Sequence, residues 1–133
     1  MDTQTTKQSI LIVEDEIPEL NTLRDKLTRE GFAILEAKNG EEGLEVALRE
    51  HPDLILLDII MPVMDGMTML KKLRSKNEWG KTVPVIILTN LTSADGQRNQ
   101  DVTEFEPAYY LVKTDWKIED VVAKVRERLA ATP

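Results

Sequence analysis

Three acidic side chains, one hydroxyl and one amine in this sequence are suited together to chemistry on a phosphoryl group. They are Glu14, Asp15, Asp58, Thr89 and Lys113. Carboxylates placed close together repel one another unless a cation joins them. Oxygen ligands without a nearby histidine or cysteine favour a hard ion, and Mg²⁺ suits a site of a few carboxylates and water. The acidic residues therefore predict a magnesium site.

The lysine and the threonine supply what an arriving phosphoryl group needs, a positive charge and a hydrogen-bond donor. A carboxylate that faces them, such as Asp58, can act as a nucleophile toward phosphorus. Positioning and charge neutralisation then account for most of the catalysis. Each residue alone has an ordinary alternative, since acids after a strand often cap the next helix. Their combination favours the chemical interpretation.

These residues must be positioned by a fold, and the composition limits which folds are available. A chain of 133 residues fits one domain with one core. The net charge of −7 argues against a nucleic-acid-binding surface, and the absence of cysteine excludes disulfides and thiolate catalysis. No apolar run approaches the roughly 20 residues of a membrane span, and residues 1–9 lack the apolar core of a secretion signal. We therefore expect a cytoplasmic protein.

Short apolar runs typical of strands alternate with amphipathic runs typical of helices. The expected strands are residues 9–13, 32–37, 53–58, 83–88 and 109–112. The expected helices are residues 17–30, 39–50, 65–75 and 117–129, with a shorter and less stable one within 92–105. Pro18 suits the first turn of a helix, and Gly31 and Pro52 each end one. Residues 77–82 are expected to form a polar loop.

The helical spacing also predicts which side chains face the core. In the first helix they are Ile17, Leu20, Leu23 and Leu27, and in the second Leu44, Ala47 and Leu48. His51 is expected in solvent at a helix end, without a chemical role.

The alternation of strands and helices predicts a parallel sheet covered by helices on both faces. Ligands of such sheets bind outside the carboxyl ends of the strands. The five candidate residues fall at these ends, on four different strands. We expect the folded domain to span residues 9–129, with a flexible N-terminal tail at 1–8 and a C-terminal tail at 130–133.

Four motifs in this order resemble the receiver domain of two-component response regulators, over residues 9–129. They are Glu14-Asp15, Asp58 followed by Met61-Pro62-Val63-Met64-Asp65-Gly66, Thr89, and Tyr110-Leu111-Val112-Lys113. The resemblance implies a flavodoxin-like (βα)5 fold, a three-layer α/β sandwich with strand order 2-1-3-4-5.

The resemblance also implies a role for each site residue. Asp58 would accept a phosphoryl group from a phosphohistidine on a sensor histidine kinase or a histidine phosphotransfer protein. Asp15 and Asp58 would bind Mg²⁺ directly, Glu14 through water, and Ile60 through its backbone carbonyl. Lys113 would pair with the phosphoryl oxygens.

The same resemblance implies a switch. Thr89 would hydrogen-bond the phosphoryl group and move toward it, and Tyr110 would swing inward behind it. The added charge would change the surface around residues 90–112. An unidentified downstream protein would recognise this surface, and a homodimer through residues 92–129 is a further arrangement that it allows. No direct contact with nucleic acid or membrane is expected.

Two residues depart from the family pattern. Thr114 follows Lys113 where the family usually has a proline after a cis peptide bond, and we expect the cis form here although it costs about 3 kcal/mol. Asn90 stands where the family typically has alanine or glycine, so its side chain would narrow phosphoryl access. Because Ile60 and Leu91 are apolar, we expect slow attack by water and a long-lived phosphoryl group.

Three other functions use a similar fold or a similar site. An aspartate-nucleophile phosphohydrolase would need a second aspartate two residues after the nucleophile, where this chain has Ile60, so no enzymatic turnover is expected. A flavin-binding electron carrier would need a phosphate loop after the first strand, where Glu14-Asp15-Glu16 would repel phosphate. The remaining alternative is a degenerate receiver that binds proteins without phosphorylation.

Overall fold

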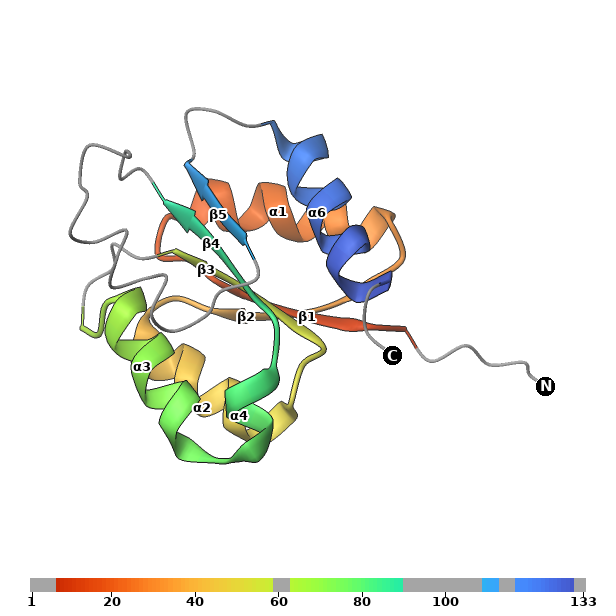
Figure 1. The fold of residues 1–133 in the computed structure, drawn as a ribbon. Coiled ribbons are helices and arrows are strands. Elements are labelled where there is room, and N and C mark those ends of the chain that lie inside the picture. Colours follow the sequence, from red (N-terminus) through yellow and green to blue (C-terminus); the bar gives the residue numbers. More distant parts are fainter. Residues whose placement is uncertain (1–6, 59–62, 90–108, 113–116, 131–133) are drawn as a thin grey trace.

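The computed structural model describes residues 7–58, 63–89, 109–112 and 117–130 (Figure 1). In these residues the strands are β1 (Ser9–Val13), β2 (Ala33–Ala37), β3 (Leu54–Asp58), β4 (Val85–Thr89) and β5 (Tyr109–Val112). The helices are α1 (Ile17–Arg29), α2 (Gly40–Glu50), α3 (Gly66–Lys76), α4 (Glu78–Thr82) and α6 (Ile118–Ala130).

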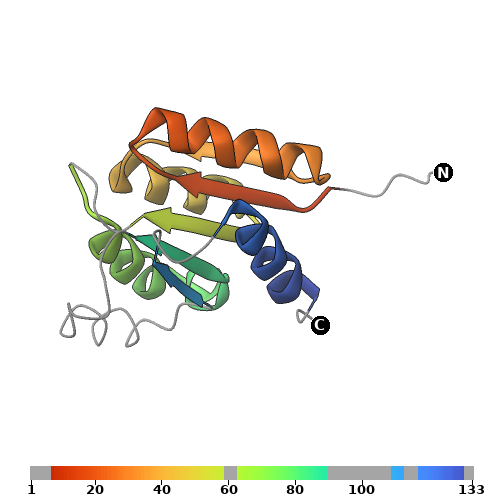
Figure 2. The same ribbon diagram turned by 90° about the horizontal axis from the view of Figure 1, so that it is seen from above.

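The strands form one parallel sheet with the order β2-β1-β3-β4-β5, which confirms the predicted fold class and strand order. Helices α1 and α6 cover one face of this sheet, and α2, α3 and α4 lie on the other (Figures 1 and 2). Every residue of β3 is buried, because this strand lies inside the sheet with helices on both sides. The buried strand therefore ends directly at Asp58.

Alternate residues of each inner strand serve two separate cores. In β1, Leu11 and Val13 pack with α2 and α3, whereas Ile10 and Ile12 pack with α1 and α6. This division follows from the two-residue period of a strand, whose successive side chains point to opposite faces. Burial of both sets fixes the register of β1, since a one-residue slip would exchange the two faces.

Local sequence explains most of the helix boundaries. Pro18 lies in the first turn of α1, and Gly31 follows its end with a φ of 102°, a conformation that glycine adopts without strain. The side chain of Asn39 caps α2 by accepting the backbone N–H of Glu42 at 2.8 Å.

None of the helices in the described residues combines the length and the hydropathy that a membrane span requires.

The predicted polar loop at 77–82 is wrong, because residues Glu78–Thr82 form the short helix α4. The Asn77 side chain caps it by accepting the Gly80 N–H at 2.7 Å. Arg74 holds its far end by donating to the carbonyl oxygens of Gly80 and Val83 at 2.9 and 2.7 Å. Tertiary contacts thus stabilise a helix that is too short to be stable alone.

Three other expectations need correction. Ile17, the first residue of α1, is 42% exposed and not part of the core. In α2 the buried apolar side chains are Val46 and Ala47, whereas Leu44 and Leu48 are only partly buried.

The fourth strand begins at Val85 instead of residue 83, because Val83 follows α4 and Pro84 has no N–H to donate. The predicted helix within 92–105 lies outside the described residues.

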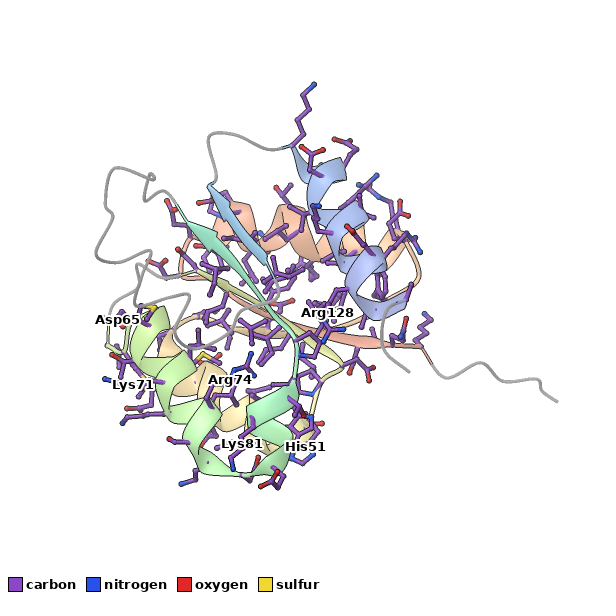
Figure 3. All side chains as sticks on the ribbon, in the orientation of Figure 1. His51, Asp65, Lys71, Arg74, Lys81 and Arg128 are labelled. Carbon is purple, nitrogen blue, oxygen red and sulfur yellow. The ribbon has the colours of Figure 1, made fainter. Side chains whose placement is uncertain are left out.

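His51 lies where it was predicted, exposed at the C-terminal end of α2. Its backbone is left-handed, with a φ of 47°, and its N–H donates to the Ala47 carbonyl at 2.9 Å. The imidazole stacks on the Trp79 indole, with ring centroids 4.2 Å apart and planes 6° from parallel. Figure 3 shows His51 beside α4, at the opposite end of α3 from Asp65.

Candidate acidic metal site

Two neighbouring strands deliver acidic residues to one edge of the sheet. β1 and β3 pair in parallel with Val13 opposite Leu57, and the next residue along each strand is acidic, Glu14 and Asp58. The backbone N–H of Glu14 donates to the Ala37 carbonyl at 3.0 Å, which extends the pairing of β1 with β2 past the strand end. Glu14 is 1% exposed and Asp58 is 5% exposed. The two carboxyl groups are therefore fixed by the sheet and withdrawn from solvent.

The carboxylates of Glu14, Asp15 and Asp58 converge. Each offers one oxygen, and these oxygens lie within 4.8 Å of one another. Asp15 is partly buried, so the group has one side toward solvent. The structure thus brings together the three acids that the sequence predicted.

This arrangement fits a hard divalent cation. Three carboxylates at such short range repel one another, and partial burial strengthens the repulsion because less water screens it. The three convergent oxygens belong to carboxylates. Hard ions such as Mg²⁺ and Ca²⁺ prefer these ligands, whereas softer metals prefer nitrogen or sulfur. A cation bound among them would replace the repulsion by attraction.

A second acidic group was not predicted. Glu14, Glu16 and Glu19 also bring one oxygen each within 4.8 Å of one another, and the Glu16 N–H donates to the Glu14 carboxylate at 3.2 Å. The sequence spacing could have indicated this group, because Glu16 and Glu19 are three residues apart at the start of α1 and so lie on the same side of the helix. Glu16 is exposed and Glu19 is partly buried, so this group is more open to water than the first.

Two hydrogen bonds hold residues 64 and 65, which lie in the described part of the connection between Asp58 and α3. The Asp65 side chain caps α3 by accepting the Thr68 N–H at 2.8 Å. The Met64 carbonyl accepts the Gly40 N–H at 3.0 Å, which joins this segment to the start of α2. Val63 has a left-handed backbone, with a φ of 68°, and is 76% exposed.

The other predicted site residues are described only in part. Thr89 is the last residue of β4, paired with Val112, and Tyr110 lies in β5, paired with Ile87. Their backbone positions agree with the prediction, and their side chains lie outside what the structure describes. Lys113, Ile60, Asn90, Leu91 and Thr114, with the predicted cis peptide bond at 113–114, also lie outside the described residues.

Comparison with known proteins gives a consistent result. The family model of the response regulator receiver domain matches residues 10–126. The transcriptional regulatory protein ResD of Bacillus subtilis is 38% identical over 128 residues, which are 95% of this chain and 50% of that protein. The chain spans half or less of the length of the curated relatives that we compared.

Two solved structures share the fold over nearly their whole length. A CheY-like receiver domain protein from Methanospirillum hungatei JF-1 has a TM-score of 0.85 and 26% identity, covering 94% of this chain and 95% of that one. The receiver domain of a sensor histidine kinase from Pseudomonas aeruginosa PAO1 has a TM-score of 0.83 and 26% identity, covering 95% and 100%. The latter structure is described with a magnesium ion coordinated in the active site cleft.

Proposed function

This chain belongs to the response regulator receiver domain family, and on that basis we propose that Asp58 is the phosphoacceptor of a two-component phosphorelay. The observation that carries the proposal is the convergence of Glu14, Asp15 and Asp58 at the ends of β1 and β3. We assign Asp15 and Asp58 as direct ligands of Mg²⁺, Glu14 as a ligand through water, and the Ile60 carbonyl as the remaining protein ligand.

The donor would be a phosphohistidine on a sensor histidine kinase or a histidine phosphotransfer protein. One oxygen of the Asp58 carboxylate attacks phosphorus, the new P–O bond forms as the P–N bond breaks, and the imidazole leaves with the bonding electron pair and takes up a proton. The buried end of β3 holds the attacking oxygen in place, which supplies positioning. Bound Mg²⁺ would neutralise charge on the transferring oxygens.

Two residues would complete the site from the neighbouring strands. Lys113 pairs with the phosphoryl oxygens, and Thr89 donates a hydrogen bond to the phosphoryl group. Thr89 ends β4, which pairs directly with β3, so its backbone lies beside the phosphoacceptor strand. Tyr110 on β5 would then respond to the movement of Thr89, and the changed surface around residues 90–112 would bind a downstream protein.

The proposal includes no turnover of small phosphoesters. Ile60 occupies the position two residues after Asp58 where aspartate-nucleophile phosphohydrolases carry a general acid. Each chain would therefore take up one phosphoryl group and lose it slowly to water. The chemistry proposed for this chain does not include the activity of any further domain in the longer relatives.

The test is incubation with acetyl phosphate and Mg²⁺, followed by intact-mass measurement. We expect the unmutated chain to gain the mass of one phosphoryl group and Asp58→Asn to gain none. Asp53→Asn is the matched control, because Asp53 precedes the same strand at its opposite, exposed end, and this variant should be phosphorylated normally. A chain that binds a kinase but gains no mass would be a degenerate receiver, contrary to the proposal.

A further inference from the structure

The helices on one face of the sheet separate their exposed charges by sign. The exposed acids of α2 are Glu41, Glu42, Glu45 and Glu50, and its exposed base is Arg49. The exposed bases of α3 and α4 are Lys71, Lys72, Lys76 and Lys81, and their exposed acid is Glu78. The ion pairs Arg49–Glu50 and Lys81–Glu78 each join close neighbours of one helix. Among the described residues, no ion pair joins the acidic helix α2 to the basic helix α3.

Within α2 and within α3, two exposed like charges lie on the same side of the helix. Glu41 and Glu45 are four residues apart on α2. Lys72 and Lys76 have the same spacing on α3, and like charges at this spacing repel. The helix dipole favours Glu41 in the first turn of α2 and Lys76 in the last turn of α3, but not Glu45 or Lys72 further inside. None of these four side chains forms an ion pair with another described residue.

Partly buried apolar side chains accompany these charges. The described ones on this side of the sheet are Leu35, Leu44, Leu48, Met64, Met67 and Trp79, whereas the other side has Ile34 and Ile118. Leu44 lies three residues after Glu41, and Leu48 lies three residues after Glu45, so leucines and acids share one side of α2. Apolar side chains at the centre and charged ones at the rim are the usual composition of a protein–protein interface.

We propose that α2 and α3 bind a second copy of this chain, with α2 of each copy against α3 of the other. The two helices are neighbours (Figure 1), and they run in the same direction because each returns from the end of one parallel strand toward the start of the next. A two-fold axis parallel to them joins acidic helix to basic helix at both contacts. An axis across them would instead place α2 against α2, acid against acid. This inference is independent of the acidic metal site.

The levels of the two helices allow the charges to meet. The Gly40 N–H at the start of α2 donates at 3.0 Å to the carbonyl of Met64, two residues before α3 begins, so both helices start near the same level. Glu45 is five residues after the start of α2, and Lys72 is six residues after the start of α3. Their levels therefore differ by about one helical turn or less. A two-fold axis parallel to the helices keeps these levels, and the long side chains of Glu45 and Lys72 can bridge the offset.

The test is sedimentation equilibrium of the unphosphorylated chain over a series of concentrations. We expect the unmutated chain to show a monomer–dimer equilibrium. Glu45→Lys and Lys72→Glu should each weaken dimerisation about tenfold or more, because each variant brings like charges together at both contacts. Glu119→Lys is the matched control, since it makes the same charge change at an exposed position of α6, on the other face of the sheet. Its Kd should stay within about twofold of the unmutated value, because distant exposed charges are screened.

An equal mixture of Glu45→Lys and Lys72→Glu makes the test specific to these two helices. In a mixed dimer the two reversed charges face each other, and the second contact keeps its original pair. Association should therefore recover to the level of the unmutated chain. A mixture that stays dissociated while the unmutated chain dimerises would overturn the pairing of α2 with α3.

Three further results would overturn the proposal. One is an unmutated chain that stays monomeric up to about 1 mM, a concentration at which even a weak dimer forms. Another is dimerisation of Glu45→Lys with the unmutated Kd. The third is loss of association in Glu119→Lys, which would place the dimer on another surface. Because all three substituted residues are exposed, the melting temperatures should change little, which separates loss of contact from loss of folding.

Discussion

The two edges of the sheet use charge in opposite ways. At the edge where the strands begin, unlike groups are paired: Asp53 accepts the Ser9 N–H at 2.7 Å, and Glu30 accepts a hydrogen bond from Arg126 at 2.6 Å. At the edge where the strands end, three like charges converge, and two of them are buried.

The difference indicates that the edge where the strands end is arranged for function at a cost in folding stability. Paired charges and satisfied backbone groups at the starting edge support folding. Repulsion among the convergent acids at the other edge opposes folding, and a bound cation would relieve it. Departures of this kind from favourable local electrostatics are expected at functional sites. Val63, five residues after Asp58 in sequence, also has a left-handed backbone that a β-branched residue rarely adopts. If the two edges are independent, a substitution at one edge should leave the other unaffected.

The largest expected effect is stabilisation by Mg²⁺. At a free concentration ten times its Kd, a ligand that binds only the folded state adds about 1.4 kcal/mol to the free energy of unfolding. Asp15→Asn should abolish this gain, whereas Glu19→Gln should keep it. Urea denaturation with and without Mg²⁺ measures the effect. If Glu19→Gln abolishes the gain and Asp15→Asn keeps it, the cation binds at the second acidic group, Glu14 with Glu16 and Glu19.

A smaller effect is expected at the starting edge. Asp53→Ala removes the acceptor of the Ser9 N–H and should lower the free energy of unfolding by about 1 kcal/mol, because the charged hydrogen bond is exposed to water. Mg²⁺ affinity should stay unchanged. Asp25→Ala is the control, since its pair with Arg24 is exposed and such pairs contribute little to stability. A change in Mg²⁺ affinity in Asp53→Ala would show that the two edges are coupled.

The smallest effect concerns Glu30 and pH. The hydrogen bond from Arg126 holds the pKa of the Glu30 carboxyl below its usual value of 4.5. A carboxyl whose pKa is lower in the folded state stabilises the fold above the unfolded pKa and loses this contribution as the pH falls through the folded pKa. Glu30→Gln should therefore be slightly less stable than the unmutated chain near neutral pH, and the difference should shrink well below pH 4.5. A difference that persists in acid would contradict this assignment.

The fold and the acidic site could be predicted from sequence because both depend on simple periodicities. Apolar runs separated by amphipathic helices dictate a parallel sheet, and such a sheet brings strand ends together. The sequence alone therefore indicates that Asp58 and Glu14 lie close together. Their predicted chemistry needed only the residue types and the rule that ligands bind at this edge.

What sequence reasoning missed depended on tertiary contacts. Residues Glu78–Thr82 look like a polar loop, and the Asn77 cap and the Arg74 hydrogen bonds stabilise them as a helix. Ile17 fits the apolar period of α1, yet it lies too near the helix start to reach the core. The close approach of Gly40 to Met64 has no local signal at all, because the two residues are distant in sequence.

The pairing of Val13 with Leu57 has a consequence for how relatives of this chain can differ in length. An insertion inside β1 or β3 would shift one acid past the other and turn its side chain to the opposite face, so the binding centre would be lost at once. Insertions in the connections at the starting edge, such as the turn between α2 and β3, leave that alignment intact. Length variation among relatives should therefore accumulate at one end of the domain and be rare at the other.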